Sequence, residues 1–322
     1  MSMAVRELAP AAMSTRSETR PIALSIAAVE RDTGLTKDTL RIWERRYGFP
    51  VPDRNALAER FYPLDQVEKL RVIKRLLDAG HRPGQIVAQP VDALLRLSDS
   101  SAAVAGPRGD PGQPDLRAYV DLVRAHDVDG LRRQLAQAQL QLGLARFVIE
   151  VISPLNTLIG DAWMRGHLEV FEEHLYTESM HVLLRQAIST VPVPETGSRP
   201  RVLLTTFPHE PHGLGLLMAE PLFLLEGCRC LSLGVQTPIW DIVLAAKSQR
   251  ADIVALSFSS ILTPTAVTTG LAELREKLPP SIEIWAGGSA PVLQRRPVAG
   301  VTALAALGAI AGETRRWRAQ HG

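Results

Sequence analysis

Cysteine is scarce in this chain of 322 residues, which contains only Cys228 and Cys230. Two cysteines cannot build a disulfide framework, and they fall short of the four ligands of a structural zinc site. They alternate along a predicted strand, which favours small buried hydrophobic side chains. The sequence therefore excludes disulfide-rich and zinc-ribbon folds.

A long hydrophobic run is also missing. The longest uncharged stretch, 297–312, is short for a membrane span and rich in Ala and Gly, so it predicts a final strand, a turn and the start of a helix. Residues 1–20 mix arginine and glutamate without an apolar core, which predicts a loose tail and no signal peptide. We therefore expect a cytoplasmic protein with no membrane partner.

Sequence motifs of catalysis are absent as well. There is no glycine-rich phosphate loop, no nucleophile elbow, and no second acid that would pair with Glu210 for turnover. We therefore expect a protein that is not an enzyme. A content of 46% hydrophobic and 22% charged residues is typical of two or three globular domains at this length.

Positive charge is concentrated in residues 1–97, which carry 16 Lys and Arg against 12 Asp and Glu, whereas the remainder carries 20 against 22. This asymmetry favours a nucleic-acid partner. The pattern predicts a helix capped by Ser25, a turn at Gly34, a second helix over 37–47, a basic wing, and a third helix over 64–79. On charge alone, a small helical bundle with a solvated basic face remains the alternative.

The sequence TLRIWERRY at 39–47 resembles the DNA-binding domain of the MerR superfamily, and the resemblance extends to HRPG at 81–84. It implies a winged helix-turn-helix domain over 21–97 that binds palindromic double-stranded operator DNA as a dimer. Lys37 and Arg41 would then lie in or beside the major groove. The complete set of expected DNA-binding residues is Lys37, Arg41, Trp43, Arg45, Arg46, Tyr47, the phosphate-holding Arg54 and Arg60, and Tyr62, which would help to shape the wing.

A linker and a helical segment follow. Residues 98–114 contain three Gly, three Pro and three Ser, which predicts a flexible linker. From 115 to 190 apolar residues recur every three or four positions, which predicts a four-helix bundle domain over 115–195. Its expected helices span 115–126, 128–142, 144–165 and 168–190.

Trp163 and the pair Glu173-His174 are the informative residues of this segment. A straight helix would hold Trp163 and His174 about 16 Å apart. A break at Gly166, a common type of helix end, would fold the helices back and bring them together. The bundle alone favours an ordinary core tryptophan and a surface pair.

Residues 200–322 predict a parallel α/β sheet of the flavodoxin-like or Rossmann type. The apolar run 202–204 leads into the polar loop Glu210-Pro211-His212-Gly213-Leu214-Gly215, and then into an apolar helix. Ser257 ends a second apolar run, and Gly287-Gly288 ends a third. Because the carboxyl ends of parallel strands meet at one edge, all three loops should open onto the same crevice.

The loop pattern Glu-x-His-x-x-Gly suits a metal ligand, because a carboxylate two residues before His212 can accept the second imidazole N–H and fix the tautomer. Taken alone, the pattern also describes a polar loop with a satisfied histidine. With Ser257 and the glycine pair, the spacing resembles the cobalamin-binding domain of methionine synthase, the mutases and their regulatory relatives. The resemblance implies that His212 binds cobalt from below, while the serine and the glycines line a slot for the nucleotide tail. Ser259 stands where that family usually has leucine.

The order of MerR head, bundle and cobalamin domain resembles the CarH-type light-responsive regulators. The resemblance implies that the bundle encloses the 5′-deoxyadenosyl group of adenosylcobalamin, which favours a tetramer that represses transcription until light breaks the cobalt–carbon bond. The complete set of expected cofactor-binding residues is Trp163, Glu173, His174, Glu210, His212, Gly215, Ser257, Ser259, Gly287 and Gly288.

Met164 is a departure from that family, in which a histidine at this position binds cobalt after illumination. A thioether is a poor substitute for imidazole on Co(III). His167, His174, His181 or water would then take the upper position.

Three alternatives remain open. The first is the same scaffold sensing another tetrapyrrole, haem or biliverdin. The second is a cobalamin-carrying methyltransferase or mutase subunit. The third is a cofactor-free MerR-type regulator in which the α/β domain binds another protein.

Overall fold

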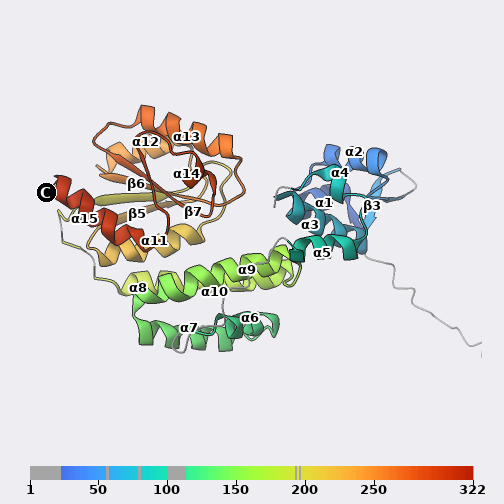
Figure 1. Cartoon of the computed structure of the whole chain (residues 1–322), viewed down its shortest axis with the longest axis horizontal. Helices are drawn as coiled ribbons and strands as arrows, with labels where there is room; N and C mark the ends of the chain where they lie inside the picture. Colours follow the sequence, from blue (N-terminus) through green and yellow to red (C-terminus); the bar gives the residue numbers. More distant parts are fainter. Residues whose placement is uncertain are drawn as a thin grey trace, which may run out of the picture. The chain divides into compact units, whose positions relative to one another are not determined.

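The computed structural model divides into two compact units, Met1–Leu94 and Leu95–Gly322 (Figure 1). The structure describes residues 23–55, 58–78, 81–100, 114–192, 194–195 and 197–321. The expected tail over 1–20, the tip of the wing at 56–57, the end of the third helix at 79–80 and most of the expected linker lie outside these residues.

The first unit begins with the predicted helix-turn-helix. The hydroxyl of Ser25 accepts a hydrogen bond from the amide of Ala28 and caps α1, Ile26–Thr33. Gly34 ends this helix in the left-handed conformation, with φ of 70°. Thr36 then caps α2, Lys37–Tyr47, whose bounds are those predicted. Both helix starts are confirmed because they depend on short-range capping that the sequence displays.

The predicted wing is an antiparallel hairpin of β2, Asp53–Arg54, and β3, Arg60–Pro63. β3 also pairs with β1, Ala23–Ser25, so the strand order is β1-β3-β2. α3, Leu64–Asp78, follows the hairpin directly. The core beneath these elements is formed by Val29, Leu40, Trp43, Tyr62, Val67, Leu70 and Ile73, all buried.

Two further helices follow, α4 at Pro83–Ile86 and α5 at Val91–Ser100. α5 therefore includes the first three residues of the linker predicted over 98–114, and the predicted start of that linker is wrong. The reason is compositional, because Ser98, Asp99 and Ser100 can continue a helix, whereas the glycines and prolines of the segment begin only at Gly106.

The second unit begins with a helical bundle formed by α6, α7, α8, α9 and α10. Their bounds are Leu116–Arg124, Val128–Leu142, Leu144–Arg146, Ser153–Met164 and Val170–Thr190. α10 starts at Val170 because Glu169 forms a reciprocal capping box with Glu172. The four predicted helical segments are thus present, with small shifts at their ends.

The third predicted helix is not uniform. A π-helical segment, Phe147–Ile152, separates α8 from α9. It ends two residues before Pro154, which has no N–H to donate to the preceding turn. The amide of Ser153 instead reaches back five residues to the carbonyl of Val148. The proline therefore accounts for the local widening of the helix.

The remainder of the unit is the predicted parallel α/β sheet, with strand order β5-β4-β6-β7-β8. Every neighbouring pair in this sheet is parallel. The strands span Arg201–Thr205 for β4, Arg229–Gly234 for β5, Ile253–Phe258 for β6, Glu283–Gly288 for β7 and Val301–Ala303 for β8. The helices span Leu214–Leu225 for α11, Ile239–Ser248 for α12, Pro264–Lys277 for α13, Val292–Arg295 for α14 and Ala309–His321 for α15.

Helices cover both faces of the sheet, which explains the continuous apolar runs of its central strands. Val202, Leu204 and Trp285 face the layer that contains α11 and α15. Their neighbours Leu203 and Val254 face the layer of α12, α13 and α14 (Figure 1).

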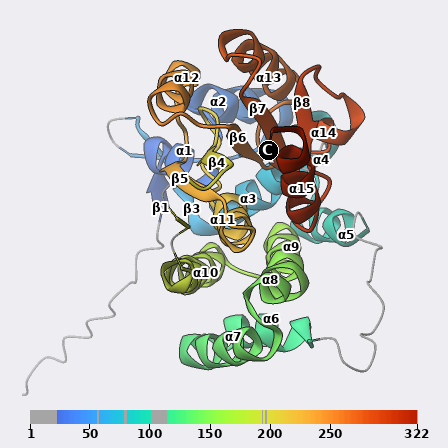
Figure 2. The same cartoon turned by 90° about the vertical axis from the view of Figure 1, so that its left-hand side faces the viewer.

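The bundle packs against α11, and α10 lies beside that helix in both views (Figures 1 and 2). The bundle residues Tyr176 and Met180 belong to the same hydrophobic core as Leu217 of α11 and Trp285 of β7. The bundle and the sheet therefore share one core, so a change in one can be transmitted to the other through packing.

Cys228 is buried just before β5, and Cys230 is half-buried within it. Burial raises the pKa of both thiols, that of Cys228 to about 11, as expected for apolar packing residues. Among the described residues, none of the helices combines the length and the apolar character that a membrane crossing requires.

Candidate functional site

The central strands β4 and β6 create a crevice at the carboxyl edge of the sheet. They are neighbours, but β4 leads into α11 on one face and β6 leads into α13 on the other. The loops that leave them diverge, which is the usual position of a ligand site in an open parallel sheet. Glu210 and His212 lie in the loop after β4, and Ser259 follows β6.

The carboxylate of Glu210 is the centre of this crevice and is completely buried. Its Oε1 atom lies 2.7 Å from His212 Nδ1 and also accepts the amide of His212 at 3.2 Å. Its Oε2 atom accepts the amide of Ser259 at 2.7 Å. The hydroxyl of Ser259 donates to the same carboxylate at 2.9–3.0 Å. One buried carboxylate thus ties the loop after β4 to the loop after β6.

The protonation of this pair follows from its hydrogen bonds. Burial opposes the charged form of Glu210, but hydrogen bonds from His212 and Ser259 outweigh it and lower the pKa of the carboxyl. The ionised carboxylate is an acceptor only, so in the neutral imidazole of His212 the proton is on Nδ1 and Nε2 keeps its lone pair. The ring is thereby held in the tautomer that a metal ligand requires.

His212 is accessible from the crevice, with 58% of its side chain exposed. Its hydrogen bond to Glu210 raises the pKa of the imidazole, partial burial opposes this, and the charges of Glu210 and Glu173 raise it further. Glu173 belongs to α10, so the bundle contributes negative charge near the imidazole. Within the described part of the chain, Nε2 of His212 has no hydrogen-bond partner.

Two glycines allow the backbone near this loop to pack closely against the end of β6. A Cβ atom on Gly215 would lie 2.2 Å from Ser257 Oγ, and one on Gly288 would lie 2.1 Å from the carbonyl oxygen of Phe258. Gly288 also has φ of 113°, which other residues rarely adopt. The glycine at 287 pairs directly with Ser257 in the sheet. The structure therefore brings Gly215, Ser257, Gly287 and Gly288 to one edge, as predicted.

A helix break at Gly166 lies between Trp163, near the end of α9, and the pair Glu173-His174, near the start of α10. Gly166 has φ of 72°, its amide bonds to the carbonyl of Trp163, and the next amide bonds to the carbonyl of Ala162. These contacts form a Schellman motif that ends α9 before α10 begins. Trp163 is partly buried against the shared core. Met164 ends α9, and its side chain lies outside the described part of the structure.

Glu173 is held in place by its neighbours on α10. Its Oε1 atom accepts the hydroxyl of Thr177 at 2.6 Å, and its Oε2 atom lies 2.7 Å from Nδ1 of His174. The side chain of His174 is 70% exposed. The pair is thus fixed at the surface of α10. Its predicted contact with a ligand remains a prediction.

Sequence inspection missed several residues that shape the crevice. Thr206 donates to the carbonyl of Glu210 at 2.6 Å and accepts the amide of Gln236 at 2.8 Å, which fixes the loop after β4. Val235 would contact a Cβ on Gly213 at 3.2 Å. Val235 and Ile261 are apolar and exposed at 39% and 49%. Val235 and Ile261 could have been identified as exposed apolar residues that follow strands, but only once the ends of β5 and β6 were known. Thr206 gives no comparable signal in the sequence.

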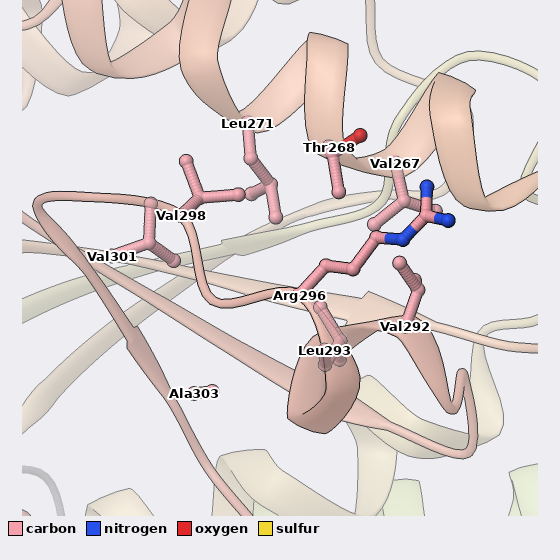
Figure 3. Close-up of a pocket in the computed structure, with 9 residues that line it drawn as sticks. All are labelled: Val267, Thr268, Leu271, Val292, Leu293, Arg296, Val298, Val301 and Ala303. Atoms are coloured by element: carbon pink, nitrogen blue, oxygen red, sulfur yellow. The ribbon is translucent and has the colours of Figure 1, made fainter.

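A pocket elsewhere in the sheet domain is no competing site. It lies between α13, α14 and β8, and Leu271, Val292 and Arg296 are among its lining residues (Figure 3). Its volume of about 10 Å³ is room for about one water molecule.

The first unit presents a basic surface on α2. Arg41, Arg45 and Arg46 are exposed, and Lys37 and Tyr47 are half-buried. Ile42, which sequence inspection did not select, is 47% exposed between these basic residues. A branched apolar side chain there could contact a thymine methyl group.

Two expected DNA-binding residues lie in the core. Trp43 is 5% exposed and Tyr62 is 0% exposed. The expectation that Trp43 contacts DNA is therefore wrong for its side chain, which packs inside the unit. Tyr62 is fully buried, so its ring cannot reach a DNA strand, and its expected part in shaping the wing remains a prediction. An aromatic residue within a basic helix gives no sequence signal that separates these roles.

Two protein-family models match separate parts of this chain. A model of the MerR HTH regulatory protein family matches residues 24–88, and a model described as a B12 binding domain matches residues 116–187. The solved structure of the monomethylamine corrinoid protein of Methanosarcina barkeri is 15% identical, with a TM-score of 0.49 over 62% of this chain and 96% of that chain.

Two curated relatives span most of the chain. The HTH-type transcriptional repressor CarH of Myxococcus xanthus is 29% identical over 265 residues, which cover 80% of this chain and 86% of that protein. The HTH-type transcriptional repressor CarA of the same organism is 31% identical over 245 residues, which cover 75% of this chain and 78% of that protein. The chain therefore belongs to the family of MerR-type HTH regulators with a B12-binding domain that includes CarH and CarA.

Proposed function

We propose that this protein is a light-responsive transcriptional repressor that binds adenosylcobalamin and grips operator DNA as a cofactor-stabilised oligomer. The observation that carries the proposal is the buried Glu210, which holds His212 in the ligand tautomer at the crevice between β4 and β6. Both curated relatives are named as transcriptional repressors, which supports a regulator rather than an enzyme.

The residues of the crevice suit a corrinoid. An imidazole nitrogen is a good ligand for cobalt, and its second nitrogen has the carboxylate partner that such ligands usually have. Gly215 packs closely against Ser257, and Gly288 packs closely against the backbone of Phe258, so a larger residue at either position would distort the edge that the ligand would contact. Val235 and Ile261 would gain apolar cover on binding.

The bundle provides the upper half of the proposed site. We assign Trp163, Glu173 and His174 to the enclosure of the adenosyl group, because α9 and α10 meet at the Gly166 break and the charge of Glu173 reaches His212. Thr177 and His174 fix the rotamer of Glu173, which prepares its carboxylate to accept hydrogen bonds from ribose or adenine. Adenosylcobalamin supplies a cobalt–carbon bond that light can cleave.

The switch follows from mass action. A ligand that contacts both the bundle and the sheet stabilises the arrangement in which both contacts exist, and losing the upper group removes that stabilisation. Several DNA-binding heads joined in one oligomer bind far more tightly than one head. Loss of the oligomer would therefore release the operator.

The decisive experiment is light-scattering mass of the full chain, with and without adenosylcobalamin, in the dark and after green light. The expected result is a larger assembly only with the cofactor in the dark. A mass that does not respond to the cofactor would contradict the proposal. A mass that responds to the cofactor but not to light would limit the protein to ligand sensing.

The absorption spectrum of the purified protein distinguishes the possible cofactors. A corrinoid, a haem and a biliverdin have different visible bands, so the spectrum identifies which one is bound. Selection of a specific duplex from random DNA would contradict a purely catalytic role as a methyltransferase or mutase subunit. A chain that binds DNA but takes up no cobalamin would instead favour the cofactor-free regulator.

A further inference from the structure

Glu44 of α2 joins the helix to both strands of the wing. Its Oε1 atom lies 3.1 Å from Arg54 Nη2, and its Oε2 atom lies 2.9 Å from Arg60 Nε. The side chains of Glu44 and Arg60 are only 23% and 24% exposed, and that of Arg54 is 47% exposed. Each carboxylate oxygen therefore serves one arginine, and each arginine comes from a different strand.

The two arginines are direct cross-strand partners in the hairpin. Like charges at such positions repel and destabilise the pairing of the strands. Glu44 offsets this repulsion with one negative charge between two positive ones, and the cluster keeps a net positive charge. The hairpin can therefore present both guanidinium groups close together, which an unneutralised pair would resist.

A buried hydroxyl lies beside this cluster. Tyr62 is 0% exposed, and its Oη atom has no hydrogen-bond partner among the described residues. Burial raises the pKa of Tyr62, and the charges of Glu44, Arg60, Arg41 and Arg54 also act on it. Tyr62 belongs to β3, two residues after Arg60, so its buried ring anchors this strand of the wing in the core of the unit.

We propose that Glu44 is a positioning residue that locks the wing onto α2, so that Arg54 and Arg60 form a fixed two-guanidinium site for one DNA phosphate. The proposal deepens the proposed function and rests on its DNA-binding part. Guanidinium groups suit this role because each offers paired donors to phosphate oxygens. On binding, the phosphate would share the arginines with Glu44.

Glu44 is acidic, so its charge alone would repel DNA. As a positioning residue it would nevertheless favour binding to a selected DNA site. Removing its charge should strengthen sequence-independent binding, which follows net charge. Removing the lock should weaken binding to a selected site, which requires the wing in register. Positioning and charge therefore shift the two kinds of binding in opposite directions.

The test uses the full chain with adenosylcobalamin in the dark. The probes are a duplex selected by the wild-type chain from a random pool and a shuffled duplex of the same composition. Glu44→Gln is compared with Glu68→Gln, which removes the same charge from an exposed position on α3. Both variants are first checked by thermal melting and assayed well below their melting temperatures.

We expect Glu44→Gln to lower affinity for the selected duplex by about tenfold, the scale of one lost specific contact, while affinity for the shuffled duplex holds or rises. Glu68→Gln should leave the ratio of the two affinities unchanged. In an Arg54→Met/Arg60→Met background, Glu44→Gln should cause no further loss, because the groups it positions are gone. The variant that combines all three substitutions carries no charge at this cluster, so neither the repulsion nor an unpaired carboxylate opposes its folding, and its melting curve is measured in the same way.

Equal tightening on both duplexes after Glu44→Gln would overturn the proposal, since charge alone would then explain the result. An undiminished loss in the double-methionine background would also overturn it. If the wild-type chain selects no sequence from the pool, the DNA-binding function itself fails, and the role of Glu44 fails with it.

Discussion

Glu210 and His212 are two residues apart in the sequence, and Oε1 of Glu210 lies 2.7 Å from Nδ1 of His212. The carboxylate is completely buried, whereas more than half of the imidazole is exposed. The buried charge of Glu210 therefore holds Nδ1 of the imidazole, while the exposed part of the ring, including Nε2, remains available to a ligand in the crevice. The proposed cofactor site depends on that asymmetry.

Glu210→Gln should weaken cobalamin binding by about 10–100-fold, the usual cost of losing the partner of a metal-binding histidine. The amide oxygen can still accept from His212, but the amide nitrogen would then face the amide of Ser259, donor against donor. Titration of the cofactor in the dark, followed by absorbance, measures the loss. His212→Ala is the reference for complete loss of the ligand, and equal affinity in both variants and the wild type would contradict the assignment.

Gly215→Ala should also weaken cobalamin binding, through the slot rather than the ligand. The added Cβ would lie 2.2 Å from Ser257 Oγ and 3.3 Å from Ser257 Cβ, so the serine must move. We expect a loss of about tenfold, with the spectrum of the bound cofactor unchanged because His212 is intact. Adding Ser257→Gly removes both contacts and should recover part of the affinity. A double variant that binds no better than Gly215→Ala would contradict this account.

The sequence predicted the elements whose determinants are local. The bounds of α2 follow from the Thr36 cap and the glycine at 48, and the Glu210–His212 pair follows from a separation of two residues. The hydrogen bond between Ser259 and Glu210 could not be predicted, because the two residues are 49 positions apart and meet only if β4 and β6 are neighbours in the sheet. The π-helical segment could not be predicted, because a proline inside a helical pattern indicates a disturbed turn without determining whether the helix kinks, ends or widens there. The burial of Trp43 was missed because aromatic residues suit both a core and a DNA surface.

Arg45→Met should reduce the salt dependence of DNA binding. Arg45 is exposed on α2, and it forms no ion pair with another residue in the part of the chain that the structure describes. If it contacts one phosphate, the slope of log affinity against log salt concentration should fall by about 0.9. Methionine keeps most of the apolar length, so the change isolates the charge. Binding measured at several salt concentrations checks the slope, and an unchanged slope would remove Arg45 from the interface.

Glu220→Gln should stabilise the cofactor-free chain at neutral pH. Glu220 lies on α11 at the contact with the bundle, only 12% exposed, and its partner Arg185 is 3.5 Å away and 56% exposed. Burial raises the pKa of Glu220, and the charge of Arg185 only partly offsets this.

The sign of the pH effect follows from that shift. The folded chain holds the proton of Glu220 more tightly than the unfolded chain, so this group favours folding below its ordinary pKa and loses that contribution as the pH rises through the raised value. The glutamine side chain of the variant cannot ionise, so the gain over the wild type should grow with pH and then level off. Each kcal/mol should raise the Tm by about 2–4 °C. Melting curves from pH 4 to 8, about the range in which carboxyl groups titrate, test this; a gain largest at acid pH would contradict it.

Ser259→Ala tests whether the departure from leucine at this position matters for the site. Its hydroxyl contacts both oxygens of Glu210 at 2.9–3.0 Å and lies 3.1 Å from His212 Nδ1, while its amide contributes a separate hydrogen bond. Alanine removes the hydroxyl but keeps the amide, so the carboxylate loses one of its two contacts with the loop after β6. We therefore expect cobalamin affinity to fall by about tenfold, less than for Glu210→Gln, because the imidazole keeps its partner. Ser257→Ala, two residues earlier, removes a hydroxyl from the slot rather than from the Glu210 carboxylate, so it measures separately how much affinity a lost slot hydroxyl costs. If Ser259→Ala binds as tightly as the wild type, the hydroxyl does not support the histidine, and the backbone amide alone holds Glu210 in place.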